Sequence, residues 1–140
     1  MRKAKTPRTR NAKGKAGAKD VANFLSAFYG DDFTPNKRGV KGSDIKCPAW
    51  FTFSVEVKNE AVHLRHLLYP TAKVRGWWEQ ALTQAQTEGK QPALFVKVES
   101  VWYARTDAST IAAPCVVGDT CAWVTLENWC LANRRVHSVT

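Results

Sequence analysis

The chain is short of several kinds of residue, and each shortage excludes a class of protein. No stretch of its 140 residues approaches the roughly 18 consecutive apolar residues of a membrane-spanning helix. No apolar segment follows the basic N-terminus, so no secretory signal is indicated. The four cysteines include no Cys-x-x-Cys pair, and no histidine stands at zinc-finger spacing from them. We therefore expect a cytoplasmic protein with reduced thiols and no membrane contact, with a disulfide between Cys115 and Cys121 as the alternative.

Acidic residues are missing from the first nineteen positions, and these positions hold eight of the 21 lysines and arginines. The other 13 basic residues are balanced by 12 acidic ones, so a nearly neutral domain follows a strongly basic tail. Such a tail indicates a polyanionic partner, most often nucleic acid, although a solubilising leader has the same composition. The expected DNA contacts are Arg2, Lys3, Lys5, Arg8, Arg10, Lys13, Lys15 and Lys19, joined by Lys37, Arg38 and Lys41.

Residues 1–17 hold too little apolar surface to offset the entropy of ordering the chain, so we expect them to be disordered in isolation. Residues 18–140 are long enough for one domain. Apolar residues recur at helical spacing over 18–29, where Gly30 follows as a C-cap. Residues 31–46 are rich in Asp, Gly and Lys and predict a loop or irregular edge.

Strict alternation over 51–58 predicts a strand, with Phe51, Phe53, Val55 and Val57 on one face. A helix is expected over 75–88, ending at Gly89; its predicted buried stripe is Trp78, Ala81, Leu82 and Ala85. A strand over 93–98 and its hairpin partner over 101–105 follow, then weaker strands over 111–117 and 121–124 and a closing helix over 126–133. This order predicts an α/β fold with a central mixed sheet flanked by helices.

Three residues carry the chemistry that the sequence suggests. Glu56 and Lys58 lie two apart on the predicted strand, so both side chains project from one face. With Asp44, Glu56 supplies the hard oxygen ligands that Mg²⁺ prefers, and the carbonyl of Val57 is a further candidate ligand. Lys58 would stabilise charge that develops on a phosphate. The alternative is an exposed strand face with an ordinary salt bridge.

The spacing of Asp44 from Glu56-Val57-Lys58 resembles that of the PD-(D/E)XK nuclease superfamily. The following helix with Gln80 and Gln84 and the strand ending in Lys97 resemble archaeal-type Holliday junction resolvases and related phage endonucleases. The resemblance covers roughly residues 18–98. It implies a restriction-endonuclease-like core, Mg²⁺ or Mn²⁺ as cofactor, a homodimer in a prokaryotic host cytoplasm, and one of the two glutamines at the metal site or DNA backbone.

The chain departs from the resolvase pattern at two places. Ser43 stands where the motif has proline. The resolvases carry a metal-binding glutamate in the first helix, and Ala18 occupies that place here. We favour Asp20 as the acid that completes the metal site, with Asp31 and Asp32 as the alternatives.

The resemblance implies a metal-dependent, structure-selective endonuclease that hydrolyses phosphodiester bonds at four-way DNA junctions during recombination. A junction has two-fold symmetry and the chain supplies one site, so paired cuts require a dimer. Two alternatives stay open. One is another nuclease of the superfamily, of nicking, repair or restriction type, and the other is a DNA-binding protein whose catalytic site has decayed.

Overall fold

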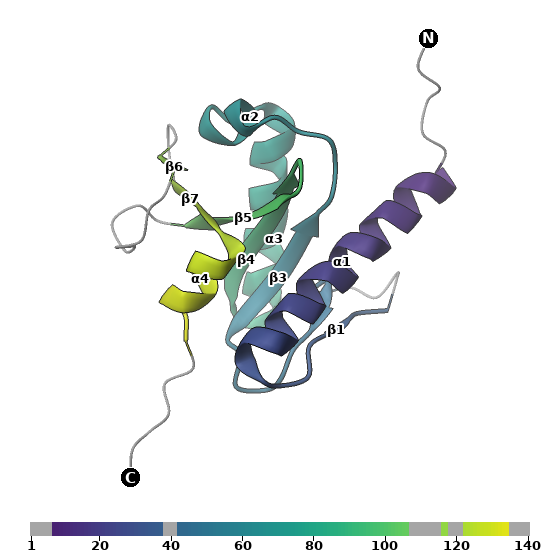
Figure 1. Ribbon diagram of the computed structural model, residues 1–140, viewed down its shortest axis with the longest axis vertical. Coiled ribbons are helices and arrows are strands. Elements are labelled where there is room, and N and C mark those ends of the chain that lie inside the picture. Colours follow the sequence, from purple (N-terminus) through teal and green to yellow (C-terminus); the bar gives the residue numbers. More distant parts are fainter. Residues whose placement is uncertain (1–6, 38–41, 107–115, 118–121, 135–140) are drawn as a thin grey trace.

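The computed structural model describes residues 7–37, 42–106, 116–117 and 122–134 (Figure 1). The helices are α1 (Pro7–Tyr29), α2 (Leu64–Leu68), α3 (Ala72–Glu88) and α4 (Leu126–Ala132). The strands are β1 (Thr34–Pro35), β2 (Ile45–Lys46), β3 (Phe53–Lys58), β4 (Gln91–Val98), β5 (Val101–Thr106), β6 (Val116–Val117) and β7 (Ala122–Thr125). Among these described helices, none combines the length and apolar character needed to cross a membrane.

A five-stranded mixed sheet with the order β3-β4-β5-β7-β6 forms the centre of the molecule. β3 and β4 run parallel and are joined through α3, while the remaining pairs are antiparallel. β1 and β2 form a separate two-stranded pair in the segment expected to be irregular. The α/β prediction is therefore confirmed, and the arrangement is that of a restriction-endonuclease-like core.

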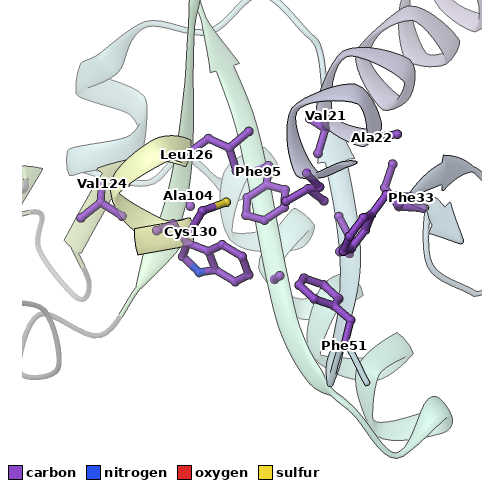
Figure 2. Packing of buried hydrophobic residues seen from close by; sticks show 14 residues of the cluster. Val21, Ala22, Phe33, Phe51, Phe95, Ala104, Val124, Leu126 and Cys130 are labelled. Carbon is purple, nitrogen blue, oxygen red and sulfur yellow. The ribbon is translucent and has the colours of Figure 1, made fainter. Parts of the chain in front are cut away.

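The two faces of the sheet carry different helices (Figure 1). One hydrophobic cluster joins α1, through Val21 and Leu25, to Phe95 of β4 and to α4. Figure 2 shows Phe95 between Val21 of α1 and the side chains of Leu126 and Cys130 of α4. The other cluster joins α3 to the opposite side of the same strands. Successive residues of β4 point to opposite faces of the sheet. A residue of β3 that is in register with a residue of β4 therefore projects toward the same helix as that residue.

The first helix begins at Pro7, so the predicted start at residue 18 is wrong. Proline at the first helical turn is favourable because its missing N–H would have no helical partner there. The helix passes close to the domain at Gly17, where an added Cβ would lie 2.7 Å from Asn59 Cβ and 3.3 Å from the Trp102 ring. The periodicity of apolar residues did not reveal this part of the helix. Its close contact with the domain is made at a glycine, which adds no apolar side chain to the sequence pattern. Disorder of residues 1–17 in isolation stays a prediction.

The helix α3 ends as predicted, with Gly89 in the left-handed conformation at φ 67°. Its N-cap is Thr71, whose side chain accepts a hydrogen bond from the Val74 N–H at 3.3 Å. The predicted buried stripe was wrong at two positions. Trp77 is buried in place of Trp78, and Leu82 is 43% exposed. The sheet contacts a face of the helix centred near Ala81, which turns Leu82 outward.

The strands β4 and β5 form the predicted hairpin, and β7 and α4 confirm the last strand and the closing helix. The strand predicted over 111–117 is described only at β6. Cys115 and Cys121 lie outside the described residues, so their pairing stays a prediction. Cys47 and Cys130 are free thiols.

Candidate active site

The segment that carries Asp44 lies along the edge of β3 that β4 leaves free. The Asp44 N–H donates to the Val55 carbonyl at 2.8 Å. The Ser43 hydroxyl accepts from the Val55 N–H at 2.9 Å and donates to the Val55 carbonyl at 3.2 Å. These bonds satisfy an edge strand that would otherwise leave backbone groups unpaired. They also fix Asp44 beside the strand that carries Glu56.

The carboxylates of Asp44 and Glu56 come together at the same strand. Oδ2 of Asp44 accepts a hydrogen bond from the Val57 N–H at 2.8 Å. Glu56 is in register with Leu94, a member of the α3-side cluster, so it projects toward α3 and is only 2% exposed. Val57 is in register with Phe95 and projects to the α1 side. The polar face of the predicted strand is therefore covered by α3 and is not open to solvent.

Both carboxyl groups hold protons more strongly than an ordinary side chain does. Burial and, to a smaller extent, the nearby Asp44 raise the pKa of Glu56 to about 7, and Lys58 opposes the shift. Burial also raises the pKa of Asp44, against the lowering effects of the Val57 N–H and of Lys58. A buried carboxylate and a half-buried one, with a single lysine beside them among the described residues, form a place where a cation is stabilised.

Lys58 provides the one ammonium group that the described residues place beside the pair. Its Nζ lies 3.8 Å from Oε2 of Glu56, and the side chain is 20% exposed. The same Nζ donates to Oε1 of Gln80 at 3.1 Å. Gln80 therefore reaches Lys58 from α3, and the role that the resemblance implies for one of the two glutamines stays a prediction.

A cleft of about 710 Å³ opens between Asp44, Glu56 and the outer side of α3. Its other lining residues are Gly42, Gly76, Glu79, Gln80, Thr83, Gln84, Thr87 and Glu88. The Nε2 atom of Gln84 is buried and has no hydrogen-bond partner among the described residues. An unpaired buried amide is unfavourable by about 1–3 kcal/mol, so the cleft offers a donor to whatever binds there.

Glu79 and Glu88 also line the cleft, and neither was predicted as a site residue. Glu88 Oε1 accepts a hydrogen bond from the Ser43 N–H at 2.8 Å and adds negative charge near Glu56. The predicted helix already contained a signal that could have found Glu88. Gln80, Gln84 and Glu88 recur at intervals of four, which places them along one side of the helix.

The donor set of the cleft suits a hard divalent cation. Mg²⁺ keeps several water ligands and binds through one or two carboxylates together with substrate phosphate, which matches Asp44 and Glu56. In the ranges that the structure describes, no three His, Cys, Asp or Glu side chains gather as a metal site of protein ligands alone. Carboxylates without histidine or thiolate favour Mg²⁺ or Mn²⁺ over zinc.

The acids proposed for the first metal ligand lie elsewhere. Asp20 Oδ2 is 3.9 Å from Nζ of Lys97, a residue of β4 that points to the α1 side of the sheet. Asp31 accepts a hydrogen bond from the Trp50 indole at 2.7 Å, and the Asp32 N–H donates to Asp31. The structure thus brings Asp44, Glu56, Lys58 and Gln80 together, and places these three acids apart from them.

The basic residues that the structure describes include several on α1. Lys15 and Lys19 are exposed, and the carbonyl of Lys13 accepts a hydrogen bond from Asn59 at 3.0 Å. Asn59 directly follows Lys58, so the basic part of α1 passes the end of β3 that carries the site. Lys37 is exposed as well. Arg2, Lys3, Lys5, Arg38 and Lys41 lie outside the described residues, and only the backbone is described at Arg8 and Arg10.

Comparison with family models matches residues 9–112 to the family described as "Phage putative PDDEXK endonuclease". Neither the curated proteins nor the solved structures give a match. The matched segment is most of the chain, and it contains Asp44, Glu56, Lys58 and the helix α3 that closes the cleft. The chain therefore belongs to the phage PDDEXK endonuclease family, within the PD-(D/E)XK nuclease superfamily.

Proposed function

We propose that the protein is a Mg²⁺- or Mn²⁺-dependent DNA endonuclease that cleaves four-way junctions. The observation that carries the proposal is the buried Glu56 carboxylate beside Asp44, with Lys58 Nζ at 3.8 Å. A carboxylate that is 2% exposed is unfavourable in a fold unless a cation compensates it. A divalent ion would supply the missing positive charge and could in turn bind the phosphate of a substrate.

Asp44 and Glu56 are the residues that would hold the ion, and the Val57 carbonyl is the further candidate. When bound, Mg²⁺ supplies Lewis-acid stabilisation of the phosphate and lowers the pKa of a bound water. The Val57 N–H holds Asp44 in place through its bond to Oδ2. The ligand geometry is therefore set by backbone contacts rather than by flexible side chains alone.

Lys58 contributes a fixed positive charge where charge grows on the phosphate. In the hydrolysis a water oxygen forms a bond to phosphorus, one phosphoester P–O bond breaks, and the leaving oxygen acquires a proton. Gln80 accepts a hydrogen bond from the Lys58 ammonium and so directs it. The unpaired Gln84 amide is a further donor that a phosphate oxygen in the cleft can accept from.

The choice of a junction as substrate rests on symmetry and on charge. One chain carries one site, and a homodimer would present two sites to the two equivalent strands of a junction. Lys15 and Lys19 lie on a helix that passes the end of β3, and phosphate contacts of this kind orient DNA without reading sequence.

Incubation with labelled four-way junction, fork, duplex and single strand, with and without Mg²⁺, tests the proposal. We expect symmetrical cuts in the junction that require the metal and disappear in Glu56→Gln. Glu127→Gln is the matched control because Glu127 is an exposed residue of α4 outside the cleft. Failure to cut any of the four substrates would overturn the endonuclease proposal, and equal cutting of duplex would overturn the junction preference.

A further inference from the structure

A second cavity adjoins the active-site cleft. It has a volume of about 180 Å³, and its walls include Trp78, Trp123 and Leu94 together with Arg75 and Arg105. Glu79 of α3 lines both this cavity and the cleft. A ligand that occupies the cleft can therefore extend past Glu79 into the cavity, which none of the roles described above employs.

Two guanidinium groups and the carboxylate of Glu79 give the cavity its charge. Cζ of Arg105 lies 3.9 Å from the centroid of the Trp78 ring, and both side chains are half-buried. Nη1 of Arg75 donates to the Pro70 carbonyl at 3.2 Å. In the described part of the chain neither arginine takes part in an ion pair. Guanidinium donors that lack a carboxylate partner favour an anionic ligand.

The rest of the lining favours a flat ring. An apolar cavity of about 150 Å³ holds one benzene molecule, so this cavity has room for an aromatic ring. Trp123 is buried and its Nε1 already donates to the Leu67 carbonyl at 3.1 Å, so it offers apolar surface only. Nucleic-acid bases stack on aromatic rings and on arginine guanidinium planes. A flat ring attached to negative charge is the chemistry of a nucleotide.

We propose that the cavity receives one unstacked base of the DNA strand whose backbone lies in the active-site cleft, with the adjoining phosphates facing Arg75 and Arg105. The inference rests on the proposed endonuclease function and adds a feature that the enzyme recognises. A base at a branch point or bulge enters without a partner to lose, whereas a base within continuous duplex must first be unpaired and unstacked. The cavity therefore favours DNA that contains a branch point or a bulge over continuous duplex.

The test uses the full chain carrying Glu56→Gln, which prevents cleavage. Fluorescence anisotropy gives the Kd for a labelled duplex with one unpaired adenine and for the same duplex fully paired. We expect the bulged DNA to bind about 5- to 100-fold more tightly, the effect of one base–aromatic stack. Arg105→Gln, and separately Trp78→Leu, should remove this preference and leave the affinity for paired duplex within about twofold. With 2-aminopurine as the unpaired base, its fluorescence should fall on binding only when the cavity is intact.

Arg65→Gln is the matched control, because it removes the same charge from an exposed residue of α2 outside both cavities, and it should retain the preference. Persistence of the preference in Arg105→Gln would overturn the proposal even if Trp78→Leu were unstable. Absence of the preference in the Glu56→Gln parent would also overturn the proposal. A difference in sedimentation coefficient between the parent and Arg105→Gln without DNA would overturn it as well, because it would mark the cavity as a contact between protein chains. The chain with intact Glu56 separates the two ideas. Metal-dependent cleavage without a base preference removes only this inference, whereas no cleavage of any DNA removes the endonuclease function.

Discussion

The backbone N–H of Ser43 donates a 2.8 Å hydrogen bond to Oε1 of Glu88, and this bond joins the Asp44 segment to the last turn of α3. Proline, the residue of the motif at this position, has no N–H and could not make the bond. The Ser43 hydroxyl also pairs with both backbone groups of Val55. Serine is therefore a structural element of this site that holds Asp44 against β3.

Ser43→Ala should destabilise the fold by about 1–3 kcal/mol, because it leaves the buried Val55 N–H without its acceptor. Urea denaturation measures the change in the free energy of unfolding. Ser100→Ala, at an exposed turn residue, serves as the control and should change stability by less than about 0.5 kcal/mol. Equal effects of the two substitutions would contradict the role assigned to the Ser43 hydroxyl.

Asp44→Asn, Glu56→Gln and Lys58→Ala should each reduce cleavage to a small residual rate, because each removes a ligand or charge that acts in the transition state. The folded state should persist, as circular dichroism can verify. Binding to DNA in Ca²⁺ should survive, and removal of a carboxylate near phosphate should tighten it. Full cleavage by Glu56→Gln would contradict the site assignment.

Gln80→Leu should lower kcat by about tenfold through misplacement of the Lys58 ammonium, with little change in KM, since leucine cannot accept the 3.1 Å hydrogen bond from Nζ. A double-mutant cycle identifies the route of the effect. In the Lys58→Ala background the second substitution should have no further effect on the residual rate. A further loss of rate in that background would show that Gln80 acts independently of Lys58.

The raised pKa of Glu56 predicts a stability that falls with pH in the absence of divalent metal. The folded-state pKa of about 7 exceeds the ordinary value of 4.5, so the folded protein binds the proton more tightly. This contribution to stability is present below about pH 4.5 and is lost as pH rises through 7. At pH 8 in a chelator, Glu56→Gln should be more stable than the parent by on the order of 1–3 kcal/mol.

Thermal melting at pH 5 and pH 8 measures this dependence, and the advantage of Glu56→Gln should shrink at the lower pH. Glu127→Gln provides the pH control because Glu127 is exposed. Added Mg²⁺ should raise the melting temperature of the parent at pH 8 and leave that of Glu56→Gln nearly unchanged. A constant difference between parent and variant across the pH range would refute the shift.

The positions of Asp20 and Glu88 lead to opposite predictions about whether each residue contributes to the metal site. Asp20 forms an ion pair with Lys97 and its side chain is 54% exposed, so Asp20→Asn should cost less than about 1 kcal/mol and leave cleavage near normal. Glu88 lines the cleft, so Glu88→Gln should weaken Mg²⁺ binding measured by calorimetry. A large loss of turnover in Asp20→Asn, partly restored by Mn²⁺, would instead establish Asp20 as the ligand favoured from the sequence.

The exposed lysines of α1 should determine part of the salt dependence of DNA binding. Replacing Lys15 and Lys19 by glutamine should weaken binding and make the slope of log K against log salt shallower, by up to about 0.9 for each phosphate that the protein no longer neutralises. The control replaces Lys46 and Arg65, which are exposed on other elements. An unchanged slope in the α1 variant would show that this helix does not bind the DNA backbone.

The sequence by itself determined the strand that carries Glu56 and Lys58, the glycine stop of α3, and the pairing of Asp44 with that strand as a candidate site. The strand follows from local periodicity, and the end of α3 follows from the conformational freedom of Gly89. Asp44 was assigned from its spacing in the sequence from Glu56 and Lys58, which resembles that of the nuclease motif. Charge counting along the chain likewise located the basic residues of α1.

Only the tertiary structure decided which acids share the cleft and which face of α3 is buried. Asp20 and Glu56 are separated by the sheet itself, because α1 and α3 cover opposite faces, and helical spacing says nothing about which face a helix meets. Glu88 joins the site through Ser43, 45 residues away in the chain. Such contacts form only when β3, α3 and the segment before β2 pack together, since each element alone leaves these polar groups in water.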